Sequence, residues 1–294
     1  MTSPLIESAR AKVNLTLRVH GRRADGFHDI ESLVAFADCA DMLTLAAAPV
    51  LELTTTGPHA QDCGEGSDNL VTRAALALGE RIAGMKSGHF TLEKHLPVAA
   101  GIGGGSADAA AALRLLARTN GIGADDPRVM DVARQTGADI PVCLTSRACT
   151  MTGVGENLSF LILPALPCVM VNPRIAVATK DVFAALGLAK GEAFAGHNDT
   201  REQSWPGDGA TSDTWCEAIS AGTNDLEPPA LKVEPRIGDV LEALRKAPGV
   251  RLSRMSGSGA TCFGIFKTAD DADEAAKAIA QAHPDWWVHA GTLS

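Results

Sequence analysis

The sequence LPVAAGIGGGSADAAAALRLL, residues 96–116, joins a glycine-rich loop to a segment of high helix propensity. Glycines occupy positions 101, 103, 104 and 105. Ser106 then provides a good helix N-cap, and four alanines lead into Leu113. Glycines let backbone N–H groups approach a ligand, and a helix N-terminus carries about half a positive charge. The segment therefore predicts an anion site, usually for phosphate, the alternative being a flexible loop before a core helix.

The composition is typical of a globular protein with one large domain or two medium ones. The chain has 294 residues, of which 46% are hydrophobic and 21% charged. Its net charge of −9 argues against nucleic acid and anionic membranes as partners. The first twelve residues contain no apolar leader, and the most apolar stretch, residues 158–171, is too short to span a membrane. We therefore expect a cytoplasmic protein, and a local positive site in this acidic chain still permits a phosphorylated small substrate.

The cysteines and histidines do not indicate a metal site. Seven cysteines are scattered without CxxC spacing, and the eight histidines include no HExxH pattern. We predict that the cysteines are buried in a reducing compartment and that the protein alone holds no metal.

Hydrophobic periodicity predicts alternating strands and helices, and hence an α+β or α/β fold whose two halves meet near residue 160. The polar, aperiodic stretch 190–215 predicts a long surface loop or a partly disordered insert. Strands are predicted over residues 12–20, 28–36, 42–56 with a break at Pro49, 89–95, 149–155, 261–266 and 286–290. Helices are predicted over 69–82, the segment after the glycine loop, 127–136, 179–186, 235–246 and 270–283.

The glycine loop does not fit the common nucleotide-binding motifs. The sequence contains no GxxxxGK[ST] motif, the third glycine of a dinucleotide fingerprint is replaced by Ser106, and the protein-kinase signatures are absent. These exclusions leave a less common phosphate loop.

Residues 97–110 follow the pattern P-x3-G-x-G-G-G-S-x-D-A-A, which resembles the second motif of the GHMP kinase superfamily. The segment ARAKVNLTL, residues 9–17, is similar to the first motif, and SRMSGSGATCFGIF, residues 253–266, is similar to the third. Residues 21–34, 67–75, 137–144 and 224–231 together resemble a branch that phosphorylates a cytidine-diphospho sugar alcohol. The resemblance covers residues 9 to about 266 and is weakest over 190–215.

The resemblance implies an α+β, two-domain GHMP kinase fold with the active site in the cleft between the halves. An N-terminal domain, residues 1–160, would carry the ATP phosphate loop, and residues 161–294 would form the C-terminal domain. It also implies ATP-dependent phosphorylation of a 2-hydroxyl in non-mevalonate isoprenoid synthesis. Mg²⁺ would arrive with ATP, and Ser106 is a candidate for a phosphate or metal contact. The partners would be ATP and a small-molecule substrate, and the oligomeric state stays open between a monomer and a weak dimer.

The resemblance also assigns site residues. Asp139 would accept the proton of the substrate hydroxyl with Lys12 as its partner, and the alternative for Asp139 is a helix cap. Substrate contacts would come from Asn14, Phe27, His28 and Phe183. The base would stack between Phe27 and His28 on one side and Phe183 on the other, with a backbone contact from His28 as an alternative to its ring. Phe183 could equally be an ordinary core residue. Asn69 and Lys94 would contact the nucleotide, with exposure to solvent as the alternative for Lys94. The other nucleotide contacts would come from the loop and the start of its helix: Pro97, Val98, Ala99, Ala100, Gly101, Ile102, Gly103, Gly104, Gly105, Ser106 and Ala107.

Two positions depart from the family pattern. Phe27 stands where the family often has tyrosine, so stacking is kept and a phenol hydrogen bond is lost. Ala107 stands where serine is frequent, and its backbone N–H can still bind phosphate.

Two alternatives remain, another GHMP kinase with a different alcohol substrate and a non-catalytic ATP-binding module. The segment ADGFH, residues 24–28, argues against the first, and the presence of Lys12 and Asp139 argues against the second.

Overall fold

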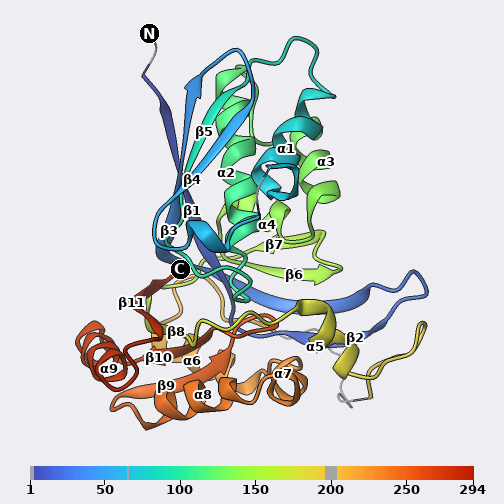
Figure 1. Ribbon diagram of the computed structural model, residues 1–294. Helices are drawn as coiled ribbons and strands as arrows, with labels where there is room; N and C mark the ends of the chain where they lie inside the picture. Colours follow the sequence, from blue (N-terminus) through green and yellow to red (C-terminus); the bar gives the residue numbers. More distant parts are fainter. Residues whose placement is uncertain (1–2, 65, 196–203) are drawn as a thin grey trace. The chain divides into compact units, whose positions relative to one another are not determined.

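The structure is a computed structural model that describes residues 3–64, 66–195 and 204–294 (Figure 1). The chain forms two compact units from interleaved segments. Unit 1 consists of Met1–Lys12, Cys39–Val98 and Gly103–Ser146, and unit 2 of Val13–Asp38, Ala99–Ile102 and Arg147–Ser294. These units differ from the contiguous halves 1–160 and 161–294, a division that stays a prediction.

Unit 1 places helices on one side of a group of strands, as Figure 1 shows. Strand β4 (Glu52–Thr56) runs parallel to β5 (Gly88–Glu93), which pairs antiparallel with the end of β3 (His28–Ala47). Strand β1 (Leu5–Asn14) also pairs with β3. The helices are α1 (Leu70–Gly79), α2 (Gly104–Thr119), α3 (Pro127–Thr136) and α4 (Ile140–Thr145), with short 3-10 turns η1 (Ala60–Asp62) and η2 (Gly66–Asp68).

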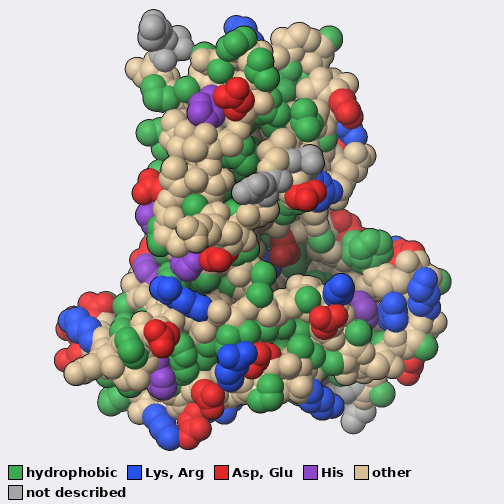
Figure 2. Space-filling view, viewed as in Figure 1, with side chains coloured by type: hydrophobic (Ala, Val, Ile, Leu, Met, Phe, Trp, Pro, Cys, Tyr) green, Lys and Arg blue, Asp and Glu red, His purple; other side chains and the backbone are tan. Residues whose placement is uncertain are grey.

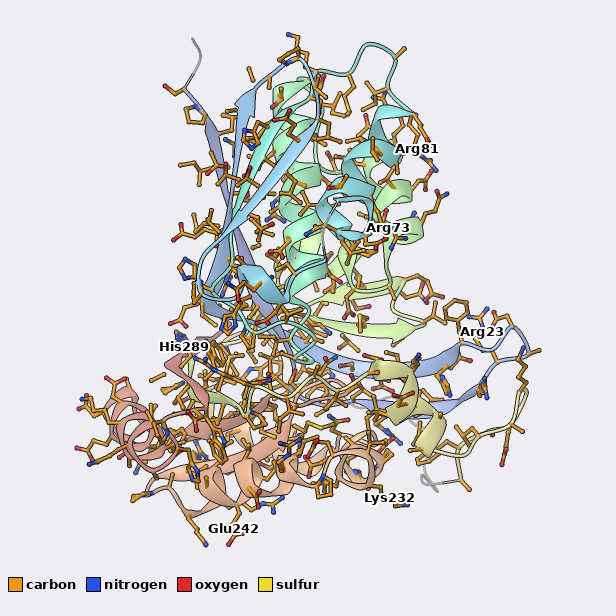
Figure 3. The ribbon with its side chains drawn as sticks, in the orientation of Figure 1. Arg23, Arg73, Arg81, Lys232, Glu242 and His289 are labelled. Carbon is orange, nitrogen blue, oxygen red and sulfur yellow. The ribbon has the colours of Figure 1, made fainter. Side chains whose placement is uncertain are left out.

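Helix α2 is the central helix of unit 1. Ten of its residues are buried, including all of Ala109, Ala110, Ala111 and Ala112. Alanine side chains are small enough for neighbouring helices to approach closely, and they carry the highest helix propensity. At the outer surface, Arg81 after α1 donates a 2.6 Å hydrogen bond to Gln135 of α3 (Figure 3). The helix layer is thus joined both in its core and at its surface.

Unit 2 combines antiparallel strands with helices. Strand β3 pairs with β2 (Arg18–Arg22) and β6 (Cys149–Gly153), and β6 pairs with β7 (Asn157–Phe160). A second series runs β11 (Trp287–Leu293), β8 (Leu166–Asn172), β10 (Cys262–Phe266) and β9 (Val250–Met255). The helices are α5 (Thr179–Ala185), α6 (Ser212–Ala221), α7 (Glu227–Val233), α8 (Arg236–Lys246) and α9 (Ala269–Ala282).

The core of unit 2 lies between these strands and helices. Val169 and Val171 of β8 pack in one cluster with Ile237, Val240 and Leu244 of α8. On the outer face, basic and acidic side chains are interspersed over α8 and α9 (Figure 2). One such pair joins Lys246 Nζ to Glu242 Oε1 at 2.5 Å. No described helix is both long enough and apolar enough to cross a membrane.

The α+β fold class is confirmed, and α3 has the predicted bounds 127–136. The single strand predicted over 12–20 is wrong, because β1 ends at Asn14 and β2 begins at Arg18. Between them, Thr16 accepts a hydrogen bond from Leu33 N through Oγ1 and one from Ser32 Oγ through its carbonyl. These bonds hold the chain out of the regular ladder.

Two further predictions need correction. Helix α2 begins at Gly104, so its N-cap is Gly103 rather than Ser106. The predicted loop 190–215 ends early, because Thr211 caps helix α6 by accepting from Thr214 N. Residues 196–203 of that stretch lie outside the described residues. The short helices α4 and α7 were not predicted.

Candidate active site

The glycine-rich loop leads into an α2 N-terminus that no side chain caps. Gly103 is the N-cap in a left-handed conformation with φ of +64°, and it has no side chain to accept from the first turn. The N–H groups of Gly104, Gly105 and Ser106 stand at the positive end of a 16-residue helix. This arrangement is suited to a phosphate group.

Lys12 and Asp139 form an ion pair within unit 1. Lys12 Nζ lies 3.0 Å from Asp139 Oδ2, and their side chains are 4% and 34% exposed. Asp139 occupies the N-cap position of α4, yet its side chain makes no cap hydrogen bond. The capping alternative therefore does not account for this carboxylate, which instead pairs with the ammonium of Lys12.

The ion pair lies directly beside the start of α2. A Cβ built on Gly103 would come within 3.2 Å of Lys12 Cε and 3.3 Å of Lys12 Cβ. Glycine at this position is thus required both by its positive φ and by the close approach of Lys12. The geometry brings a carboxylate, an ammonium and a bare helix N-terminus together within one unit.

The middle of the glycine loop is held by the third motif within unit 2. A Cβ on Gly101 would lie 2.5 Å from the Ser256 carbonyl oxygen, so only glycine fits there. Ser256 Oγ donates to the Gly101 carbonyl at 2.9 Å and accepts from Asn14 N at 3.1 Å. Asn224 Nδ2 donates to the carbonyls of Met255 and Gly257, which sets the course of this motif.

Asn14 and Asn69 both have structural partners. Asn14 is 1% exposed and donates through Nδ2 to Ser32 Oγ at 2.7 Å. Asn69 caps helix α1, where its Oδ1 accepts from Val71 N at 2.9 Å. Their predicted contacts with substrate and nucleotide stay predictions.

Lys94 is buried inside unit 1, where its ammonium group forms hydrogen bonds with two carboxylates. Its Nζ donates to Asp41 Oδ2 at 2.5 Å and to Asp108 Oδ2 at 2.6 Å, and its side chain is 3% exposed. The alternative of an exposed lysine is therefore wrong. Sequence reasoning did not identify Asp41 or the pairing with Asp108. The sequence offers one signal for this pairing, which is Asp41 within an apolar strand segment. A buried carboxylate needs a partner of opposite charge or a hydrogen-bond donor.

The aromatic residues of the predicted base site lie in unit 2. The rings of His28 and Phe183 stack directly, with centroids 4.4 Å apart, which leaves no room for a base between them. Phe183 also packs against the core of unit 2, whereas Phe27 is 62% exposed. Nε2 of His28 is buried without a hydrogen-bond partner among the described residues, and burial and then Arg22 lower the pKa of this imidazole.

Across residues 3–64, 66–195 and 204–294, no group of three or more His, Cys, Asp or Glu side chains is placed to hold a metal ion. None of the seven cysteines, all of which are described, forms a disulfide, and five of them are buried.

Comparisons with known proteins agree with the geometry. The family model described as GHMP kinases N terminal domain matches residues 69–147, and the one described as GHMP kinases C terminal matches residues 212–285. A 4-diphosphocytidyl-2-C-methyl-D-erythritol kinase of Bradyrhizobium sp. (strain ORS 278) is 66% identical over 295 residues, covering 100% of this chain and 98% of the relative. One of Rhodopseudomonas palustris (strain BisB5) is 65% identical, with 99% of each chain covered.

Solved structures give the same relationship. The crystal structure of a 4-(cytidine 5'-diphospho)-2C-methyl-D-erythritol kinase matches with a TM-score of 0.76 and 34% identity, covering 99% of each chain. A homoserine kinase from Cytophaga hutchinsonii has a TM-score of 0.71 at 18% identity over 100% of this chain and 96% of the other, and shares the fold alone. The resemblance seen in the motifs is confirmed, and the chain belongs to the GHMP kinase family, in its branch of 4-diphosphocytidyl-2-C-methyl-D-erythritol kinases.

Proposed function

We propose that this chain transfers the γ-phosphoryl group of ATP to the 2-hydroxyl of 4-diphosphocytidyl-2-C-methyl-D-erythritol, a step of non-mevalonate isoprenoid precursor synthesis. The names of relatives more than 60% identical over the whole chain support this substrate. The observation that carries the chemistry is the position of the Lys12–Asp139 pair against Gly103 at the start of α2.

Asp139 is the group that accepts the proton of the attacking hydroxyl. A hydroxyl is a weak nucleophile unless a base within hydrogen-bond distance takes its proton during attack. The side chain of Asp139 is partly exposed, so a substrate hydroxyl can reach it. Lys12 holds this carboxylate in position through the ion pair, and its ammonium can stabilise negative charge on the transferring phosphoryl group.

The N-terminus of α2 binds the phosphates of ATP. The backbone N–H groups of residues 104–106 and the Ser106 hydroxyl supply donors there, and the backbone of residues 97–103 leads up to them. The N–H of Ala107 is not one of these donors, because it bonds the Gly103 carbonyl at 2.8 Å. Mg²⁺ arrives bound to ATP and neutralises charge on its phosphates. On the side of the chain, the Ser106 hydroxyl would be the candidate contact to the ion or to the phosphates.

The cytidine part of the substrate contacts the aromatic residues of unit 2. The exposed ring of Phe27 offers a stacking face, and the unpartnered Nε2 of His28 can accept or donate one hydrogen bond to a base. Phe183 stacks on one face of the His28 ring and holds that ring in place. We place the reaction in the cytoplasm, in keeping with cysteines that form no disulfide.

A substrate comparison tests the proposed function. Purified protein with ATP and Mg²⁺ is offered 4-diphosphocytidyl-2-C-methyl-D-erythritol, homoserine, mevalonate or galactose, and ADP release is measured for each. We expect turnover with the cytidyl substrate alone, and phosphorus NMR of the product to show a new phosphomonoester at the 2-position. Preferential phosphorylation of any of the other three alcohols would contradict the assignment.

A further inference from the structure

Three charged side chains form a buried cluster beneath the phosphate loop in unit 1. Lys94 stands just after β5, Asp41 lies in β3, and Asp108 lies in α2. Their side chains are 3%, 0% and 4% exposed, and Lys94 Nζ bonds both carboxylates, at 2.5 Å to Asp41 and 2.6 Å to Asp108. We call this cluster the lysine–carboxylate triad.

The second oxygen of Asp41 holds the chain where it enters the loop. Asp41 Oδ1 accepts from His95 N at 2.6 Å and from Leu96 N at 2.8 Å. These are the last residues before Pro97, where the loop begins. One carboxylate therefore holds the entry of the loop through its Oδ1 and binds Lys94 through its Oδ2.

The triad also contacts the exit of the loop. Asp108 lies one turn into α2, and a Cβ built on Gly104 would come within 3.3 Å of Lys94 Nζ and 3.9 Å of Asp41 Oδ2. Gly104 is the first residue of α2 and supplies one of its N-terminal N–H groups. Residues on both sides of the loop are thus fixed by a single set of charged hydrogen bonds.

A buried triad of this kind is costly as a means of stabilising a core. Removing charges from water costs several kcal/mol per ion, and well-packed hydrophobic residues often stabilise a fold as well or better. What charged hydrogen bonds supply instead is a fixed geometry. Here the geometry is the distance between Leu96 and Gly104, which sets how the loop presents its N–H groups.

We propose that Asp41, Lys94 and Asp108 are positioning residues that fix the two ends of the phosphate loop and thereby set the affinity for the phosphates of ATP. In this arrangement Lys94 acts through the loop, with its ammonium already shared by two carboxylates. The inference rests on the proposed function, because it concerns how ATP is held. It assigns no contact of the triad with the alcohol substrate.

The test compares Asp41→Asn and Lys94→Met with a matched control, Glu7→Gln. Glu7 accepts from Arg114 Nε at 3.0 Å and also pairs with Arg118, so it is an ion-pair partner of the same helix α2 away from the loop. Asn has the shape of Asp and keeps an acceptor oxygen, so Asp41→Asn disturbs packing least. For each full-length variant we measure the dissociation constant of a non-hydrolysable ATP analogue, the KM for each substrate, and thermal unfolding.

We expect Asp41→Asn and Lys94→Met to weaken analogue binding and raise the KM for ATP by about tenfold or more, with the KM of the alcohol substrate within about twofold. Glu7→Gln is expected to lower the unfolding temperature and leave the ATP parameters unchanged. Unchanged ATP affinity in folded Asp41→Asn would overturn the inference. The inference would also be overturned if Glu7→Gln lost as much ATP affinity as Asp41→Asn for the same loss of stability.

Measurements on the wild-type protein distinguish a failure of the proposed function from a failure of the inference about the lysine–carboxylate triad. If it phosphorylates the cytidyl substrate while Asp41→Asn binds ATP normally, the inference fails and the proposed function stands. If it binds ATP through the loop but uses another alcohol, the substrate assignment fails and the variants still decide the inference. If the wild-type protein does not bind the analogue, both fail.

Discussion

Nζ of Lys12 lies 3.0 Å from Oδ2 of Asp139, with the ammonium buried and the carboxylate partly open to solvent. The exposed partner is the one that a substrate can reach, and the buried partner holds it in place. Asp139 stands at the start of α4 without capping it, so its side chain remains directed to Lys12. Substitutions of Asp139 and substitutions that displace Lys12 are therefore expected to have different effects on catalysis.

Asp139→Asn is expected to reduce kcat by about 10²–10⁴-fold with little change in ATP binding. The amide has nearly the shape of the carboxylate and cannot accept the hydroxyl proton as a base. Turnover with the cytidyl substrate and calorimetric titration with an ATP analogue measure the two quantities. Asp126→Asn is the matched control, because Asp126 caps α3 through Arg128 N and asparagine caps equally well. A kcat equal to that of the wild type would show that Asp139 is not the base.

Gly103→Ala is expected to lower kcat by about tenfold, because the added Cβ would meet the Lys12 side chain at 3.2–3.3 Å and displace it. Gly121→Ala provides the control. Gly121 has a φ of +68°, close to the +64° of Gly103, but a Cβ there meets nothing within 4 Å. Both variants therefore carry a similar backbone strain of about 1–2 kcal/mol. Equal kcat values in the two variants, measured alongside their unfolding free energies, would rule out a specific effect on Lys12.

The features predicted correctly from the sequence have local causes. Helix α3 begins after the capping residue Asp126 with proline at its first position, and ends at Gly137. The approach of Lys12 to Asp139 was expected from the motifs that surround them, but the absence of a cap bond at Asp139 required the structure. Local pattern thus predicted that Lys12 and Asp139 lie together and left the geometry of the pair open.

The features that were missed depend on distant contacts. Lys94 is 53 positions from Asp41 and 14 from Asp108, so no periodicity links the three. Helices α4 and α7 have six and seven residues, too few to produce a hydrophobic repeat. The start of α2 was placed too late because glycine is a poor helix former, and here the tight packing around Gly104 outweighs propensity.

Phe27→Ala is expected to raise the KM for the cytidyl substrate by about tenfold, with the KM for ATP and the unfolding temperature nearly unchanged. The ring is 62% exposed, so its loss removes a stacking face and little core packing. Phe160→Ala removes another exposed ring, 43% accessible, from strand β7 and is expected to leave both KM values unchanged. A cytidyl KM that does not respond to Phe27→Ala would exclude this residue from base binding.

The stability of the protein is expected to rise as the pH falls through 7, because of Asp108. Burial raises the pKa of this carboxyl to about 7, against a smaller opposing effect of Lys94, and its Oδ1 has no hydrogen-bond partner among the described residues. In the unfolded chain the pKa returns to the ordinary value of 3.8. Between these two values the folded state binds more protons, so the free energy of unfolding increases as the pH is lowered.

Urea unfolding of the wild type and Asp108→Asn, at about pH 5.5 and about pH 8, measures this effect. Asparagine does not titrate, and all other groups are common to both proteins, so the difference between their unfolding free energies isolates Asp108. We expect the wild type to gain stability relative to the variant at the lower pH. Burial lowers the pKa of Lys94, but the neighbouring Asp108 and Asp41 outweigh burial and raise it overall. When Asp108 is protonated, the bond of Lys94 to Asp41 remains. A pH-independent difference, or a relative gain at the higher pH, would mean that Asp108 remains ionised in the folded protein across this range.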